Sequence, residues 1–171
     1  QGANGNVGDG ERYGLEVNSS TRMRMIGLPN LLINASISVE DSRITDPFLG
    51  IDRRFTFNSR GRQTLGFRHD FPSKRINWGV RFVNTPDGNR KFYDLIDVEV
   101  WETDPFWTAF FEWRSRNNTT VRLEANRLGN WQFCRQRFRY NGGIAEGYLA
   151  ELENNCNHSG HDITLRVTGT F

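Results

Sequence analysis

Residues 162–171 alternate without a break between apolar or small side chains and polar ones. A period of two places each set on one face of a β-strand, so this run predicts a strand with one apolar and one polar face. The run ends on the aromatic Phe171, and strands that cross an outer membrane carry aromatic residues where they meet the membrane surface. A half-buried strand of a β-sandwich fits the same residues equally well, and the rest of the chain has to decide between the two.

The composition excludes several classes of function. Only 36% of the 171 residues are hydrophobic, and no apolar run approaches the roughly 18 residues that a membrane-spanning helix needs. A β-barrel stays compatible with this composition, since only alternate residues of its strands face lipid. The formal net charge of +2 gives no general reason to expect a nucleic-acid partner. No constellation of residues proposes catalysis, and we expect no enzyme activity, no cofactor and no bound metal.

Six further segments alternate in the same way, and they are residues 13–17, 33–40, 64–71, 77–82, 107–114 and 121–126. The connections between successive segments are short and long in turn. The short ones are 26–30, 72–75 and 117–118, and the long ones are 42–62, 84–105 and 129–161. Short turns at one end and long loops at the other are typical of an outer-membrane barrel. We therefore expect an all-β fold, an antiparallel transmembrane β-barrel segment of about seven strands.

The alternation assigns side chains to two faces. The apolar set, which we expect to face lipid, is Ile33, Ile37, Val39, Leu65, Phe67, Trp78, Val80, Phe82, Trp107, Phe111, Trp113, Val121, Leu123, Ile163, Leu165, Val167 and Phe171. The polar set, which we expect to face the lumen, is Arg68, Asp70, Arg81, Glu112, Arg114, Arg122, Glu124, Asn126 and Arg166. Opposite charges lie two residues apart within the polar set, as Arg68 with Asp70, Glu112 with Arg114, and Arg122 with Glu124. A wet lumen accommodates such charges, whereas a sandwich core would exclude them.

The connection 129–161, which we expect to be a long extracellular loop, holds both cysteines of the chain. In an exported protein Cys134 and Cys156 would form a disulfide that closes a loop of roughly 20 residues and stabilises the fold by about 3 kcal/mol. The apolar residues between 144 and 152 predict one short helix in the same connection.

Two further features lie in the long connections. Arg135, Arg137 and Arg139 alternate beside aromatic residues. Either they contact an anionic ligand or the phosphates of lipopolysaccharide, or they belong to a strand that extends above the membrane with its charges in water. In the connection 84–105, the apolar residues of 98–101 predict a second such extension.

Several of these motifs resemble the C-terminal end of a TonB-dependent outer-membrane receptor. The residues that carry the resemblance are 10–16 near the start, 34–36 and Asp46-Pro47 in the second hairpin, and 120–128 before the terminal strand. In this family the penultimate strand typically ends in an Asn-Leu pair, whereas here Arg127 separates Asn126 from Leu128. The resemblance covers essentially the whole chain and looks closest to the receptors of alphaproteobacteria.

The resemblance implies a barrel of about 22 strands around a plug, with residues 1–171 as the last portion of its wall. It implies active uptake of a scarce ligand such as a siderophore, cobalamin, haem or an oligosaccharide, driven by the TonB complex through parts that this segment does not contain. The implied partners are the remainder of the barrel and its plug, in the same or a separate polypeptide, outer-membrane lipid and lipopolysaccharide, and the barrel-assembly machinery. The implied location is the bacterial outer membrane.

Two other interpretations stay open at this point. The chain is a self-contained eight-stranded outer-membrane barrel if residues 98–102 supply a missing strand. It is a secreted all-β binding domain, such as a lectin-like sandwich, if the apolar faces pack on each other. An odd number of strands cannot close a bacterial barrel, so in the receptor interpretation both edge strands have to pair with other polypeptide.

Overall fold

The computed structural model describes residues 7–56, 58–86, 90–129 and 131–169, and in these ranges it is all-β apart from three short 3-10 turns. The strands are β1 (Gly10–Met23), β2 (Leu28–Asp46), β3 (Ile51–Arg53), β4 (Gly61–Phe71), β5 (Ile76–Asn84), β6 (Arg90–Tyr93), β7 (Asp97–Thr103), β8 (Phe106–Arg114), β9 (Thr120–Leu128), β10 (Gln132–Tyr140), β11 (Leu149–His158) and β12 (Asp162–Thr168). The turns are η1 (Arg24–Ile26), η2 (Pro72–Lys74) and η3 (Ile144–Glu146). Within the described ranges, no helix is long and apolar enough to cross a membrane.

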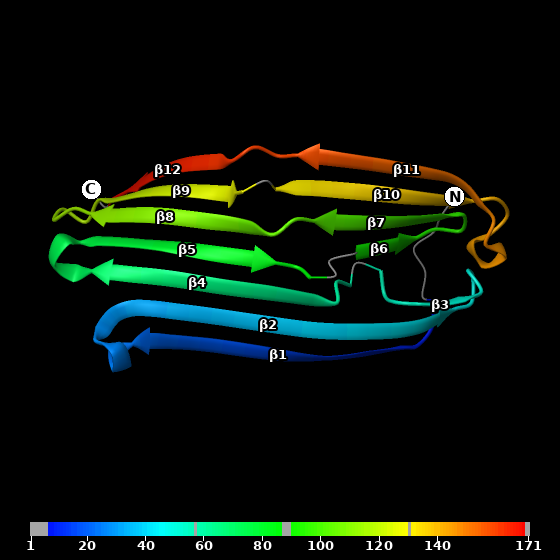
Figure 1. Cartoon of the computed structure of the whole chain (residues 1–171), viewed down its shortest axis with the longest axis horizontal. Coiled ribbons are helices and arrows are strands. Elements are labelled where there is room, and N and C mark those ends of the chain that lie inside the picture. Colours follow the sequence, from blue (N-terminus) through cyan, green and yellow to red (C-terminus); the bar gives the residue numbers. More distant parts are fainter. Residues whose placement is uncertain (1–6, 57, 87–89, 130, 170–171) are drawn as a thin grey trace.

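The main sheet is an antiparallel meander with the order β1-β2-β4-β5-β8-β9-β12, and the short β3 pairs beside β4 on the same strand β2. Its members coincide with the segments predicted from the alternation, and each pairs with the next one along the chain (Figure 1). This confirms the all-β, antiparallel fold class. In the described residues β1 and β12 are the two edges of this sheet, which is open rather than closed into a barrel.

The short connections are tight turns that reverse the chain at one end of the main sheet, here named the turn end. Gly27 takes a φ of +78° and its N–H donates to the carbonyl of Arg24 at 3.1 Å. Arg75 takes a φ of +55°, and its N–H donates to the carbonyl of Pro72 at 3.2 Å. Each turn therefore satisfies its own backbone within three residues, which keeps the neighbouring strands in register.

A second, four-stranded sheet with the order β11-β10-β7-β6 continues the wall beyond the main sheet, at what we name the extension end. Figure 1 shows β7 in line with β8, β10 with β9, and β11 with β12. The predicted strand at 98–101 is confirmed as β7. The connection 129–161 contains the hairpin β10–β11, and the helix expected at 144–152 is replaced by η3 and the start of β11.

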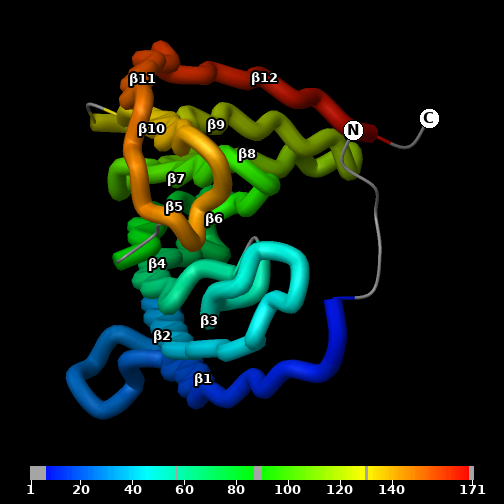
Figure 2. The backbone as a smooth tube through the Cα atoms, turned by 90° about the vertical axis from the view of Figure 1, so that its right-hand side faces the viewer, coloured from blue at the N-terminus to red at the C-terminus, as the bar shows by residue number. Residues whose placement is uncertain are grey.

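This arrangement bears on both alternative interpretations. Strand β7 pairs with β10 and β6, so residues 98–102 do not supply an eighth strand at an edge of the main sheet. The two sheets meet end to end, and the paired faces of a sandwich are not found among the described elements. Figure 2 shows the result as one curved wall that runs from β1 to β12.

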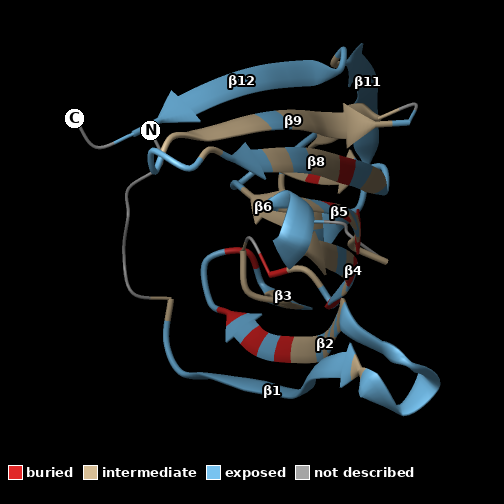
Figure 3. Ribbon diagram, turned by 90° about the vertical axis from the view of Figure 1, so that its left-hand side faces the viewer, coloured by how far each residue is buried: buried red, intermediate tan, exposed pale blue. Residues whose placement is uncertain are grey.

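Very little of the wall is a hydrophobic core. The buried apolar residues of the described ranges are Ile44, Leu49, Val83 and Val100. Figure 3 shows that exposure is greatest along β1, β11 and β12, the strands at the open edges. A domain that had to fold in water around its own core would bury far more of its apolar side chains than this wall does.

Candidate functional site

One face of the main sheet is apolar across all of its long strands. Cross-strand pairing places Ile33 opposite Phe67, Phe67 opposite Val80, and Val80 opposite Ala109, and the same row continues through Ala125 to Ile163. Residues that pair directly across antiparallel strands share a face. The register therefore brings the apolar set together on one face, here named the apolar face, except for Phe171, which lies outside the described residues.

The apolar face is exposed and bordered by aromatic rings. Leu15 is 70% exposed, and Leu165 near the opposite edge is 66% exposed. Towards the turn end, the ring of His69 lies 4.3 Å from that of Phe71 and 6.4 Å from that of Trp78. Towards the extension end, the rings of Phe82 and Trp107 are 4.8 Å apart. On β4 the apolar face extends from Leu65 to Phe71. At about 3.4 Å per residue, these two residues are about 20 Å apart along the strand.

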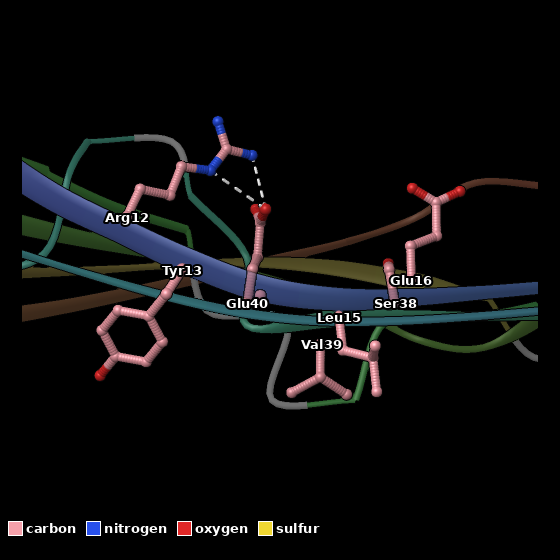
Figure 4. Close-up of a pocket in the computed structure, with 8 residues that line it drawn as sticks. Arg12, Tyr13, Leu15, Glu16, Ser38, Val39 and Glu40 are labelled. Atoms are coloured by element: carbon pink, nitrogen blue, oxygen red, sulfur yellow. Dashed lines mark hydrogen bonds and ion pairs between the residues drawn. The ribbon is translucent and has the colours of Figure 1, made fainter.

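The opposite face of the same strands is polar and held by ion pairs, and we name it the polar face. Arg122 lies at its centre: it bonds to Glu112 at 3.3 Å and Glu124 at 3.0 Å, and its guanidinium lies 4.1 Å from the ring centroid of Phe110. Arg68 donates to Asp70 at 2.8 Å. The register places the whole polar set on this face. Figure 4 shows the same division on β1 and β2, with Arg12 and Glu40 on one side and Leu15 and Val39 on the other.

The structure adds cross-strand partners to the predicted charge pairs. Two of them form, Arg68 with Asp70 and Arg122 with Glu124. Glu112 contacts Arg122 and accepts from Asn77 at 3.0 Å. These contacts follow from the register, because Arg122 on β9 and Asn77 on β5 are both directly opposite Glu112 on β8.

The polar face contains an aromatic residue that the alternation did not single out. Phe110 lies directly opposite Gly79, and a Cβ on that glycine would be 2.5 Å from the Phe110 ring. The ring therefore covers the space that a side chain at Gly79 would occupy, and Arg122 stacks on the ring. The sequence signal for this contact was Phe110 itself, an apolar residue at a position where the alternation predicts a polar one, on a strand that pairs with a strand containing a glycine.

A buried polar cluster joins the two sheets near the extension end, and it was also missed. Asp46 is 3% exposed and Arg53 is 8% exposed as side chains, and Arg53 Nε donates to the Asp46 carboxylate at 2.8 Å. The same carboxylate accepts the N–H groups of Phe48 at 2.9 Å and Leu49 at 3.1 Å. The Arg53 guanidinium lies 5.0 Å from the ring centroid of Tyr93 on β6.

The electrostatics of this cluster favour an ionised carboxylate. Burial by itself raises the pKa of Asp46, but the bonds from Arg53 and from the N–H groups of Leu49 and Phe48 outweigh burial and lower the pKa below its usual value. The segment after Asp46 also bonds to β2 through Ser42, whose hydroxyl accepts the N–H of Phe55 at 3.1 Å. Residues 47–56 and 58–60 of this connection are therefore fixed against the polar side of β2.

The alternating arginines of β10 have protein partners. Arg137 and Arg139 both bond to Asp97 on β7, with Nε to carboxylate distances of 3.1 and 3.2 Å. Arg139 also donates to Glu151 on β11 at 2.8 Å, and Arg135 lies 3.6 Å from Glu153. These contacts favour the strand-extension interpretation over an anionic ligand, because acidic side chains already occupy the guanidinium groups.

The predicted disulfide is confirmed. Cys134 and Cys156 are directly opposite on β10 and β11, their Cα atoms are 4.1 Å apart, and a bond joins their sulfur atoms across 22 residues of sequence. The bond fixes the register of the β10–β11 hairpin within the connection 129–161.

The described residues do not gather three or more His, Cys, Asp or Glu side chains in an arrangement that could hold a metal ion. Comparison of the chain with protein-family models, with curated proteins and with solved structures found no match.

Proposed function

We propose that residues 1–171 form part of the wall of an outer-membrane β-barrel, with the apolar face in lipid and the polar face towards the lumen. The observation that carries the proposal is the register, which joins apolar side chains into one exposed, aromatic-bordered face over seven long strands. Monomers in water rarely expose contiguous apolar patches larger than roughly a few hundred Å². A bilayer covers such a face without a second protein layer.

The polar face supports the same proposal. Arg122, Glu112 and Glu124 form a bonded group in the middle of the sheet and not at its rim. Their side chains are each about one-sixth to one-third exposed, so they border open space on the polar side. Charges in this position stay hydrated if the face lines a wet lumen, whereas a packed layer would have to desolvate them at a cost of several kcal/mol per ion.

We propose further that the complete barrel is a TonB-dependent receptor that imports a scarce ligand. This step rests on the sequence resemblance, carried by residues 10–16, 34–36, Asp46-Pro47 and 120–128. The rest of the barrel, the plug and the TonB complex would supply ligand binding and energy, and the barrel-assembly machinery would insert the barrel into the membrane. The two sheets fit this proposal, since strands that continue beyond the main sheet at one end would extend the barrel wall above the outer surface of the membrane.

A pair of arginine substitutions tests the membrane assignment. Val80→Arg places a charge in the middle of the apolar face, and we expect it to lower the stability of the chain in vesicles by about 2–4 kcal/mol. Thr64→Arg places the same charge on the polar face and should change stability little. Denaturant titration in vesicles measures both. A sheet that faces water on both sides would tolerate Val80→Arg as well as Thr64→Arg, and that result would contradict the proposal.

The mass of the native species tests the receptor assignment. The chain itself is 19.8 kDa. Electrophoresis in mild detergent should show a species several times larger, because the chain is one arc of a larger wall. A heat-modifiable monomer of the chain's own mass would mean that it closes on itself, and the uptake proposal would then lose its support.

A further inference from the structure

The charges of the wall are distributed unevenly between its two ends. At the extension end, the connections 47–60, 85–105 and 129–161 contain ten acidic and eight basic residues. At the turn end, the connections 24–27, 72–75 and 115–119 contain no acidic residue. They contain four basic ones, here named the turn cations, which are Arg24, Lys74, Arg75 and Arg116. The turn end is therefore the basic end of the wall.

The turn cations are exposed, and the acids nearest to them along the chain have other partners. Asp70 lies two residues before the connection 72–75, and it accepts from Arg68 at 2.8 Å. Glu112 lies three residues before the connection 115–119, and it contacts Arg122 at 3.3 Å. Among the residues that the structure describes, no acidic side chain forms an ion pair with a turn cation. The positive charge of the turn end is therefore available to a partner outside the chain.

The turn cations begin where the apolar face ends. Arg75 directly precedes Ile76, and Ile76 lies opposite Phe71 on β4 and Trp113 on β8. The N–H of Arg114 donates to the carbonyl of Arg75 at 2.9 Å, so the second and third turns are neighbours. Figure 1 shows the turn between β1 and β2 at the same end of the sheet. Aromatic rings of membrane barrels lie at the level of the lipid headgroups, which places cations in the next residues of the chain beside the lipid phosphates.

The first turn combines its cation with an apolar tip. Met25 is 95% exposed and Ile26 is 67% exposed, and both follow Arg24 directly. Apolar and basic side chains lie together in segments at a membrane surface, where the apolar groups enter the acyl boundary and the cations stay among the headgroups. An acidic protein would also attract the cations, but it would not account for apolar side chains at the tip or for the aromatic residues beside Arg75. The surface therefore fits lipid better than an acidic protein.

We propose that the turn end is a docking surface for anionic phospholipid headgroups, whose phosphates bind to Arg24, Lys74, Arg75 and Arg116. A guanidinium group bonds two phosphate oxygens at once, and an ammonium group adds a point charge. The short turns of an outer-membrane barrel are periplasmic, so these lipids belong to the periplasmic leaflet. The inference rests on the proposed function, because it needs the apolar face in a bilayer. It adds the class of headgroup and the residues that select it.

Electron paramagnetic resonance of spin-labelled lipids tests the inference. The chain is placed in vesicles of dimyristoylphosphatidylcholine that contain a trace of spin-labelled phosphatidylglycerol or, separately, of spin-labelled phosphatidylcholine. The fraction of each label that is immobilised at the protein surface gives the association of the anionic lipid relative to the neutral one. The turn variant replaces all four turn cations by glutamine. A charge-matched control variant replaces four basic residues outside the turn end by glutamine, which are Arg62, Arg81, Arg90 and Lys91.

We expect the unmodified chain to prefer phosphatidylglycerol about fivefold or more, since each cation near an anionic lipid surface contributes about that factor. The control variant should keep this preference, and the turn variant should lose it. At about 1 M salt, where the Debye length is about 3 Å, the unmodified chain should also lose most of it. The salt measurement needs no substitution, so it tests the inference even if the turn variant fails to fold.

Three results would overturn the inference and leave the membrane proposal intact, provided that the chain floats with the vesicles. The first is equal association of the two lipids with the unmodified chain. The second is a preference for phosphatidylglycerol that the turn variant or high salt leaves unchanged. The third is equal association of the lipids together with binding of soluble polyglutamate that the turn variant loses, which would make the partner an acidic protein. A chain that does not float with the vesicles would overturn both proposals.

Discussion

The buried pair of Asp46 and Arg53 gives a prediction with a definite size. Asp46→Asn keeps the shape of the side chain but leaves the Arg53 guanidinium, 8% exposed, without its counter-charge. Removing one member of a buried pair costs about 3–5 kcal/mol. Arg53 keeps a bond to the Arg54 carbonyl at 3.0 Å and its position over Tyr93. We therefore expect the lower figure, about 3 kcal/mol.

Hydrogen exchange of the segment 47–56 measures this cost. The N–H of Gly50 bonds to the Asp46 carbonyl at 2.9 Å and that of Phe55 to Ser42 at 3.1 Å, so both report whether the segment is docked on β2. At about 1.4 kcal/mol per factor of ten, the loss corresponds to roughly 100-fold faster exchange through local opening. Adding Arg53→Leu to Asp46→Asn should restore part of the protection, because no buried charge then remains unpaired.

The matched control is Asp52→Asn, which removes a carboxylate from the exposed pair that Asp52 forms with Arg43. Exposed ion pairs contribute little, so exchange of the segment should hardly change. If Asp46→Asn and Asp52→Asn accelerated exchange by the same small factor, burial of the Asp46 pair would not be what fixes the connection, and the reasoning would be wrong.

Three further predictions concern pH, the disulfide and a glycine. Because the folded pKa of Asp46 is lowered, its contribution is complete above the unfolded value of about 3.9 and is lost as the pH falls through the folded pKa; the protection of 47–56, measured as exchange relative to the unfolded chain at the same pH, should fall below about pH 4, and less so in Asp46→Asn. Replacing both cysteines by serine should destabilise β10–β11 by about 3 kcal/mol, seen as faster exchange in β11 with β12 unchanged; equal loss in both strands would contradict a local role. Gly79→Ala brings a Cβ to 2.5 Å from the Phe110 ring and 2.6 Å from the Phe67 carbonyl, whereas at Gly66 nothing is closer than 3.9 Å; denaturant titration should show a loss of about 1–3 kcal/mol for the first and little for Gly66→Ala.

The main sheet was predictable from sequence because its two faces differ in chemistry. Alternation along each strand fixed which residues share a face, and joining the apolar faces left one register for neighbours such as Phe67 and Val80. Short turns with Gly27 or Asn118 at a positive φ marked the reversals. The lipid and lumen assignments of those faces stay predictions that the vesicle experiments address.

The second sheet, at the extension end, was harder to predict because both of its faces carry polar side chains or a mixture of polar and apolar ones. Strand β11 contains Glu151, Glu153 and Asn154 with few apolar residues, so its alternation carries little signal. Its register comes from partners on β10, through the disulfide and the Arg139 to Glu151 bond, and these contacts appear only in three dimensions. The apolar residues between 144 and 152 suggested a helix, but β11 begins at Leu149 because hairpin pairing overrides that local pattern.

The buried cluster could not be predicted for a related reason. Asp46 and Arg53 become neighbours only because β2 and β3 form a hairpin with Ile44 opposite Arg53. Tyr93 approaches Arg53 from β6, in another sheet. Nothing in a single polar connection distinguishes a charge that will be buried in this way from one that stays in water.

The most direct test of the central claim is fluorescence from single probes on adjacent residues of one strand, with the chain in vesicles that contain a lipid-linked quencher. Phe67 lies on the apolar face and Arg68 on the polar face of β4. A probe at Phe67 should be blue-shifted and quenched from within the bilayer, and one at Arg68 should report water. The same contrast should repeat at Leu123 and Glu124 on β9. Equal signals at the two residues of each pair, or the reverse contrast, would contradict the membrane wall.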